Sequence, residues 1–341
     1  MTPLIIGGFE IEPGERRLIE LPIAKLYTDI DVNLPIHVIR GRRDGPTVFV
    51  SAAIHGDELN GIEIIRRLLK GDYRGFRGTL IAVPMVNVYG VLAQTRYMPD
   101  RRDLNRAFPG SRKGSLAGRL ADLFTREIVA QSDYGIDLHT GAIHRSNLPQ
   151  IRGNMDDEVT RELGQVFGAP VLLNSDLRDG SLRQVADEMG VKMLLYEAGE
   201  ALRFDEICIR AGLRGVENVL RHLGMFGSRR KPRKMPQPVL ARDSGWVRAT
   251  GSGLVIHHRQ LGDSVEAGER LAEITSPSTA ETVDVMAPRA GIIIGKQQIP
   301  LVQDGEAMYH IAYFRRMETA TERVEAFQTD FQSELEAEDD V

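Results

Sequence analysis

The chain has 341 residues, of which 42% are hydrophobic, so it is long enough to bury the cores of two domains. Its first residues lack a basic start followed by an apolar stretch, and no run of about 18 apolar residues occurs, which argues against a signal peptide and a membrane span. The net charge is -5, and residues 318–341 hold nine acidic residues against Arg323 alone. The remainder is nearly neutral, which gives nucleic-acid binding little support. We therefore expect a cytoplasmic globular protein that binds neither membranes nor nucleic acid.

The first two segments of the chain differ in pattern. Residues 1–45 carry Pro and Gly turns between short alternating runs, which predicts a β segment packed on the domain that follows. From residue 46 to 228, apolar β-branched runs alternate with amphipathic segments, such as the one where Leu120 and Phe124 recur at helical spacing after the cap residue Ser115. Residues 46–228 are therefore expected to form an α/β domain, with a mostly parallel or mixed sheet flanked by helices.

Polar residues follow four of the predicted strands. The first strand ends at His55 and Glu58, the second at Asn87, the third at His139 and a later one at Glu197. Because the carboxyl ends of parallel strands form one rim of an open sheet, we expect these side chains to converge on one crevice.

Two histidines and a carboxylate in this group have the composition of a zinc site. His55 and Glu58 stand three residues apart, and His139 on a neighbouring strand completes the set. Three such ligands with an open fourth position are usual for catalytic zinc. The pair alone is a weak signal, because this spacing arises by chance in many chains. The strand-end position and "DLHT" at 137–140 favour one zinc ion per subunit over histidines satisfied within a loop.

Two aspartates lie beside these ligands. Asp137 stands two residues before His139, on the same face of an extended strand, and would either orient the imidazole of His139 or bond to backbone. Neither alternative is favoured. Asp57 would either support a ligand or cap the following helix, and the cap is favoured.

A hydrolase also needs a base. Zinc lowers the pKa of a bound water toward about 7, but a side chain must take its proton and pass it to the leaving group. Glu197 directly follows the apolar part of "LLYEAGE", whereas Glu200 lies further into the loop and is expected to be solvated. We expect Glu197 to be the general base and acid, with a buried structural carboxylate as the alternative.

The segment "QTRYMPDRRDLNRAFPG" is a long polar loop crowded with arginine. Loops of this length are usually functional or disordered, and the apolar residues Leu104 and Phe108 argue against disorder. The planar guanidinium suits carboxylates and developing oxyanions. We therefore expect Asn105 and Arg106 to bind a carboxylate of the substrate, and Arg96 to bind the carbonyl oxygen of the scissile bond.

After residue 228 the pattern changes. Residues 229–243 include "RRKPRK", which favours a basic, solvated, Pro-containing linker. Residues 244–316 contain two similar halves of short strands punctuated by glycine, which predicts a small all-β, barrel-sandwich-like domain. The halves resemble those of biotinyl and lipoyl domains, but the hairpin between them has no lysine, so we expect a structural role or a wall of the active site. Residues 317–341 form an acidic tail, for which solvated disorder is favoured over a frayed helix.

Together these features resemble the succinylglutamate desuccinylase and aspartoacylase family, relatives of the zinc carboxypeptidases. The matching pieces are "HGDE" at 55–58, "TRY" at 95–97, "DLNRAFPG" at 103–110, "DLHT" at 137–140 and "YEAGE" at 196–200. The resemblance implies the following roles: zinc ligands His55, Glu58 and His139, general base and acid Glu197, carbonyl-binding Arg96, and carboxylate-binding Asn105 and Arg106. It also implies a C-terminal β-domain beside the active site. The sequence has "GDE" where several members have "GNE", and the interval from Arg96 to Arg106 is longer than in aspartoacylase, so the resemblance carries the reaction type and not the substrate.

The leading hypothesis is a zinc-dependent amidohydrolase that cleaves the acyl amide of a small N-acyl amino acid or related compound carrying a carboxylate. A zinc carboxypeptidase acting on peptides is the second interpretation, disfavoured because the C-terminal β-domain would narrow the crevice. A metal-binding scaffold without turnover is the third, and the presence of Glu197 and Arg96 beside a full ligand set argues against it. The acyl group and the amine stay open, and a homo-oligomer is compatible with the sequence.

Overall fold

The computed structural model describes residues 3–175, 177–226 and 237–339. The first ten strands are β1 (Leu4–Ile6), β2 (Phe9–Ile11), β3 (Arg16–Lys25), β4 (Asp31–Arg40), β5 (Arg43–Ala52), β6 (Arg77–Val83), β7 (Tyr134–Gly141), β8 (Arg145–Gly153), β9 (Val171–Asn174) and β10 (Lys192–Glu200). The later strands are β11 (Val239–Ala241), β12 (Asp243–Arg248), β13 (Gly253–His257), β14 (Ser264–Val265), β15 (Arg270–Thr275), β16 (Thr282–Met286), β17 (Gly291–Gln297), β18 (Leu301–Val302) and β19 (Ala307–Tyr313). The helices are α1 (Asn60–Leu68), α2 (Val88–Ala93), η1 (Leu104–Arg106), α3 (Leu116–Glu127), η2 (Val129–Gln131), α4 (Glu158–Phe167), α5 (Leu182–Glu188), α6 (Glu206–His222) and α7 (Met317–Asp339).

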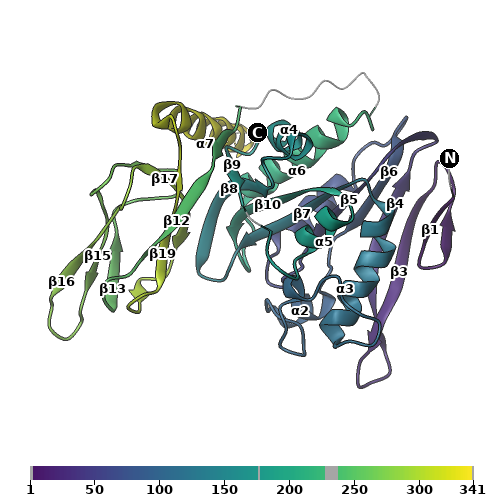
Figure 1. Cartoon of the computed structure of the whole chain (residues 1–341), viewed down its shortest axis with the longest axis horizontal. Helices are drawn as coiled ribbons and strands as arrows, with labels where there is room; N and C mark the ends of the chain where they lie inside the picture. The colour runs from purple at the N-terminus through teal and green to yellow at the C-terminus, as the bar shows by residue number, and fades with distance from the viewer. Residues whose placement is uncertain (1–2, 176, 227–236, 340–341) are drawn as a thin grey trace.

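One mixed sheet runs through most of the molecule. Within the described residues it has 13 strands, ordered β12-β19-β17-β8-β10-β7-β5-β6-β4-β3, with β9 joined to β8, β11 joined to β9 and β14 joined to β17. Figure 1 shows the purple N-terminal strands at one end of this arrangement and the green and yellow C-terminal strands at the other. β3 near the N-terminus and β19 near the C-terminus thus share one hydrogen-bonded sheet, whereas β1 and β2 form a separate two-stranded sheet.

The middle of the sheet is parallel. β6, β5, β7 and β10 pair in parallel, and the antiparallel pair β3 and β4 flanks them at the β6 side. Phe49 packs into the core shared with α3 and α5, whereas Val48 and Val50 pack into the core shared with α1, α4 and α6. Strands covered on both faces read as near-continuous apolar runs, which explains "TVFVSAA". The expected α/β sheet flanked by helices is confirmed.

The C-terminal region adds antiparallel strands. β17, β19 and β12 extend the main sheet beyond β8, and a second sheet, β16-β15-β13-β18, packs against them. Val255, Ile274, Ile293 and Ile311 lie in the apolar core of this region. The expected C-terminal all-β region is confirmed.

The acidic C-terminal segment is helical. α7 buries Ala320, Val324, Phe327 and Phe331, which recur at steps of three and four residues. The guanidinium of Arg214 on α6 stands over the ring of Phe331, 4.5 Å from its centroid. This corrects the expectation of a solvated tail, because one apolar stripe is enough to dock a helix whose other faces are charged.

The segment predicted as a linker divides into two parts. Residues 229–236 lie outside the described residues, whereas Val239–Ala241 forms β11 beside β9 and Asp243 begins β12. The domain boundaries stay a prediction. Among the described residues, every helix is too short or too polar to cross a lipid bilayer.

Candidate active site

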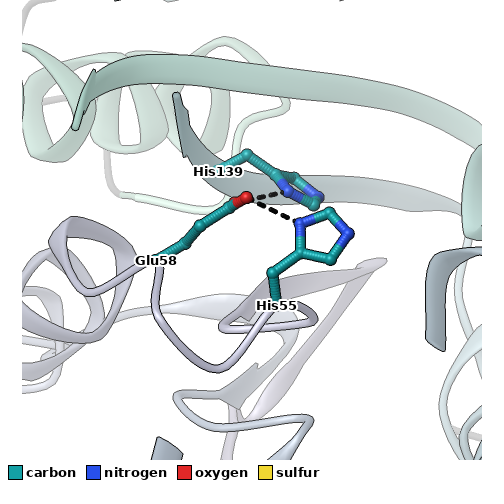
Figure 2. A group of neighbouring side chains, drawn as sticks. All are labelled: His55, Glu58 and His139. Carbon is teal, nitrogen blue, oxygen red and sulfur yellow. Dashed lines mark hydrogen bonds and ion pairs between the residues drawn. The ribbon is translucent and has the colours of Figure 1, made fainter. Parts of the chain in front are cut away.

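His55, Glu58 and His139 meet at the carboxyl ends of the central strands (Figure 2). The first two lie in the loop between β5 and α1, and His139 lies near the end of β7. The Nδ1 atom of His55 is 2.7 Å from Oε1 of Glu58, and the Nδ1 atom of His139 is 2.8 Å from Oε2. All three side chains are buried, and their potential ligand atoms lie within 4.8 Å of one another. Segments far apart in sequence thus bring three side chains that could ligate a metal ion to one point.

An aspartate contacts the other nitrogen of each imidazole. Nε2 of His55 lies 3.2 Å from Asp103, and Nε2 of His139 lies 2.6 Å from Asp137. Asp137 also accepts a hydrogen bond of 2.7 Å from the hydroxyl of Ser51. The structure therefore shows the first of the two alternatives for Asp137, a contact with the imidazole of His139. Carboxylates in this position orient metal-binding histidines and raise their basicity.

The carboxylates around the cluster stabilise positive charge on the imidazoles of His55 and His139. Burial disfavours the charged form of each group, but the neighbouring charges outweigh it. The pKa of Glu58 is held well below its ordinary value by His55 and His139, and the carboxylates around the two imidazoles raise the pKa of both. Two imidazole nitrogens and a carboxylate oxygen are a donor set that suits Zn²⁺, so the residues fit such an ion.

The loop that carries His55 and Glu58 packs tightly on α2. A Cβ on Gly56 would lie only 1.9 Å from the backbone carbonyl carbon of Gly90, so this position requires glycine. Asn87 caps α2 by accepting a hydrogen bond from the N–H of Gly90. Asn87 therefore positions α2 and does not line the cavity beside the cluster, contrary to the expected convergence.

Asp57 does not have the expected capping role. The N-cap of α1 is Leu59, which makes no side-chain cap bond. The Oδ1 atom of Asp57 is buried without a hydrogen-bond partner among the described residues, and burial raises the pKa of this carboxyl.

Glu197 lies beside His139. The two residues are register partners on the parallel strands β10 and β7, so their side chains leave the same face of the sheet, and both line one cavity. The carboxylate accepts a hydrogen bond of 2.6 Å from the Asn147 amide and pairs with Arg152 at 3.2 Å. Glu200, which we expected to be solvated, instead accepts a hydrogen bond from the N–H of His144 and does not line the cavity.

The arginine-rich loop also reaches this cavity. Arg96 contacts Asp103 at 2.9 Å and Glu58 at 3.4 Å. Arg106 donates to the carbonyl oxygen of Asn105 at 2.5 Å. The side-chain oxygen of Asn105 accepts from the N–H of Leu182, which ties the loop to the start of α5. Arg96, Asn105 and Arg106 all line the cavity, as the sequence predicts.

The cavity has a volume of about 770 Å³ and is strongly cationic, since eight arginines line it against four carboxylates. Several residues here were missed by sequence reasoning: Asp103, Arg145, Asn147, Arg152, Trp246 and His310. Asp103 opens the motif "DLNRAFPG" and could have been found from it. The others could not, because β8 is interrupted by Pro149 and its pairing with the C-terminal strands has no local signal.

A stack of three side chains forms the far wall. The ring of Trp246 on β12 lies parallel to that of His310 on β19, with centroids 4.5 Å apart, and the guanidinium of Arg145 on β8 is 4.6 Å from the Trp246 centroid. The C-terminal region therefore supplies part of the lining of the cavity.

The chain is similar to known proteins over most of its length. The chain is 29% identical over 320 residues to the N-alpha-acetyl-L-2,4-diaminobutyric acid deacetylase of Halomonas elongata, covering 89% of this chain and 93% of the relative. A product-bound structure of the ectoine utilization protein EutE (DoeB) from Ruegeria pomeroyi matches with a TM-score of 0.79 at 25% identity, covering 89% of this chain and 96% of the other. A succinylglutamate desuccinylase from Silicibacter sp. TM1040 matches with a TM-score of 0.78 at 26% identity, with the same coverage of 89% and 96%.

The family comparison covers the part of the chain that holds the cluster. The succinylglutamate desuccinylase/aspartoacylase catalytic domain matches residues 44–223, which include His55, Glu58, His139 and Glu197. The match spans more than half of the chain, and the chain therefore belongs to the succinylglutamate desuccinylase/aspartoacylase family.

Proposed function

We propose that the protein is a zinc-dependent amidohydrolase that removes the acyl group from a small N-acylated amino acid, or a related compound, that carries a carboxylate. The observation that carries this proposal is the buried set of His55, Glu58 and His139 in one cavity with Glu197. The relative from Halomonas elongata is a deacetylase of an N-acetylated amino acid, and it aligns along nearly the whole chain.

His55, Glu58 and His139 would hold one zinc ion per chain. Such an ion supplies a Lewis acid that polarises a carbonyl oxygen and lowers the pKa of water. Glu197 takes the proton of the attacking water and returns it to the nitrogen as the C–N bond breaks. This assignment is supported by its place beside His139 on the same face of the sheet.

The arginines have separate tasks in this proposal. A guanidinium has five N–H donors, so Arg96 can keep its contacts with Asp103 and Glu58 and still donate to the oxygen of the acyl carbonyl. Arg106, with the amide of Asn105, binds the carboxylate of the substrate. The excess of arginine over carboxylate around the cavity supports an anionic substrate. The cytoplasmic location stays a prediction.

The variant Glu197→Gln tests the proposal, because it keeps shape but removes basicity. We expect native zinc content and native Tm, with kcat lowered roughly 10²- to 10⁴-fold in an assay of amine release from a panel of N-acetylated and N-succinylated amino acids. Glu200→Gln is the matched control, since Glu200 lies outside the cavity, and should keep its kcat. Near-native kcat in Glu197→Gln, or no amine released by the zinc-loaded native protein, would reject the proposed function.

A further inference from the structure

The carboxylate of Glu197 is held on one oxygen only. The amide nitrogen of Asn147 donates a hydrogen bond of 2.6 Å to Oε2, and Nη2 of Arg152 forms an ion pair of 3.2 Å with the same atom. None of the described residues donates a hydrogen bond to Oε1. The side chains of Glu197 and Arg152 are largely buried, with 18% and 17% of their surface exposed, so water does not dominate these contacts.

We propose that Asn147 and Arg152 are positioning residues that fix which oxygen of Glu197 exchanges the proton. The inference rests on the proposed function, in which Glu197 is the general base. Donors to a carboxylate oxygen stabilise its charge and make that oxygen the less basic of the two. Oε2 is therefore kept as an anchor, and the proton taken from water goes to Oε1 and leaves from Oε1 to the amine nitrogen. The water loses one proton to the carboxylate and the amine gains it, so the carboxylate is restored.

Both positioning residues come from β8, the strand that joins the two regions of the molecule. Asn147 is a register partner of Gly199 on β10 and of Gly295 on β17. A Cβ on Gly295 would lie 3.0 Å from Oδ1 of Asn147, which is tighter than nearly all real contacts, so the glycine leaves the room that the Asn147 side chain occupies. The C-terminal region thereby affects Glu197 through Asn147 and not by a direct contact.

A double-mutant cycle on the zinc-loaded full chain separates positioning from a merely structural role. Asn147→Ala and Arg152→Gln are each expected to lower kcat by about 10- to 100-fold, the loss for one hydrogen bond to a charged group, with little change in KM, zinc content or Tm. In the Glu197→Gln background, adding Asn147→Ala should lower kcat by no more than about twofold, because the residue through which Asn147 acts has already been disabled. Ser146→Ala on the same strand, whose side chain does not line the cavity, is the matched control.

A milder variant probes the same contact from the other region. Gly295→Ala adds one methyl group 3.0 Å from Oδ1 of Asn147 and 3.0 Å from Cβ of His310, so these two side chains must shift by a few tenths of an ångström and kcat should fall only a few-fold. The loss should again vanish in the Glu197→Gln background.

The outcomes separate this inference from the function on which it rests. Near-native turnover by Glu197→Gln overturns both. If Glu197→Gln is inactive but Asn147→Ala and Arg152→Gln keep native kcat, only the positioning role is overturned. Equal fold-losses from Asn147→Ala in the native and Glu197→Gln backgrounds also overturn it, because the residue would then act on something other than Glu197.

Discussion

Two walls of the cavity differ in how their polar atoms are satisfied. On the wall built by β5 and β7, both ring nitrogens of His55 and of His139 contact a carboxylate. On the wall built by β8, β12 and β19, Nε of Arg145 and Nδ1 of His310 are buried with no hydrogen-bond partner among the described residues. Buried donors are rarely left unpaired in folded proteins. On the first wall each ring nitrogen has a carboxylate partner, whereas on the second wall these two buried nitrogens have no partner among the described residues.

The charge on the two walls also has different origins. On the first wall, carboxylates stabilise positive charge on the imidazoles. On the second, burial and the nearby guanidinium groups of Arg152, Arg145 and Arg178 lower the pKa of His310 to about 3, so this imidazole is neutral at neutral pH. The second wall therefore takes its positive charge from arginine, and this charge does not change with pH in the physiological range.

The largest expected effect is on the first wall. His139→Ala should remove zinc and abolish amine release, because two remaining ligands hold the ion poorly. Metal analysis by mass spectrometry and the deacylation assay check both. His144→Ala is the control, since His144 is exposed and lies outside the cavity. Stoichiometric zinc in His139→Ala would remove His139 from the ligand set.

A change at Asp137, which contacts the proposed ligand His139, should have a milder effect. Asp137→Asn keeps the shape of the side chain but removes the charge that holds His139, and we expect zinc affinity to weaken by about 10- to 100-fold. Competition with a zinc chelator measures this affinity. Excess zinc should restore most of the turnover, and native zinc affinity would show that the contact with His139 does not tune the metal site.

On the substrate-binding side, Arg106→Lys keeps the charge and should raise KM by about 10-fold, because an ammonium cannot bind a carboxylate in the bidentate geometry of a guanidinium. The methyl ester of the best substrate should be turned over poorly by the native protein. Equal kcat/KM for acid and ester would exclude Arg106 from carboxylate binding.

The smallest expected effect concerns stability on the second wall. The pKa of His310 is about 3 in the folded chain and near 6.5 in the unfolded chain, so the unfolded state takes up more protons as the pH falls between these values. The contribution to stability is complete above about pH 6.5 and is lost on acidification, by at most about 1.4 kcal/mol per pH unit. His310→Gln should flatten the difference between denaturation free energies at pH 7 and pH 5. An unchanged difference would mean that folding does not lower the pKa of His310.

The sequence predicts the first wall far better than the second. "HGDE" follows the apolar strand β5, "DLHT" and "YEAGE" form the carboxyl ends of β7 and β10, and parallel strands bring these ends together whatever the loops between them do. The ligand cluster therefore follows from local patterns and one topological rule.

The second wall depends on pairings that no local pattern encodes. Arg145 and Trp246 are about 100 residues apart in sequence, and they meet only because β8 pairs with β17, β17 with β19 and β19 with β12. α7 was missed for another reason, since nine acidic residues hid a stripe formed by Val324, Phe327 and Phe331. The prediction gave more weight to the acidic composition of this segment than to its apolar periodicity. In the fold, the apolar stripe is buried against α6.

The position of β8 in the middle of the sheet has a consequence for biosynthesis. When the ribosome has released residues up to 223, the ligands and Glu197 can already assemble, but the edge of β8 from Arg145 to Asn147 has no partner until β17 emerges. An unpaired edge strand is a template for association with other chains. Until translation reaches Gly291–Gln297, the nascent chain would therefore hold the cluster of His55, Glu58 and His139 beside an unpaired strand edge that can associate with other chains.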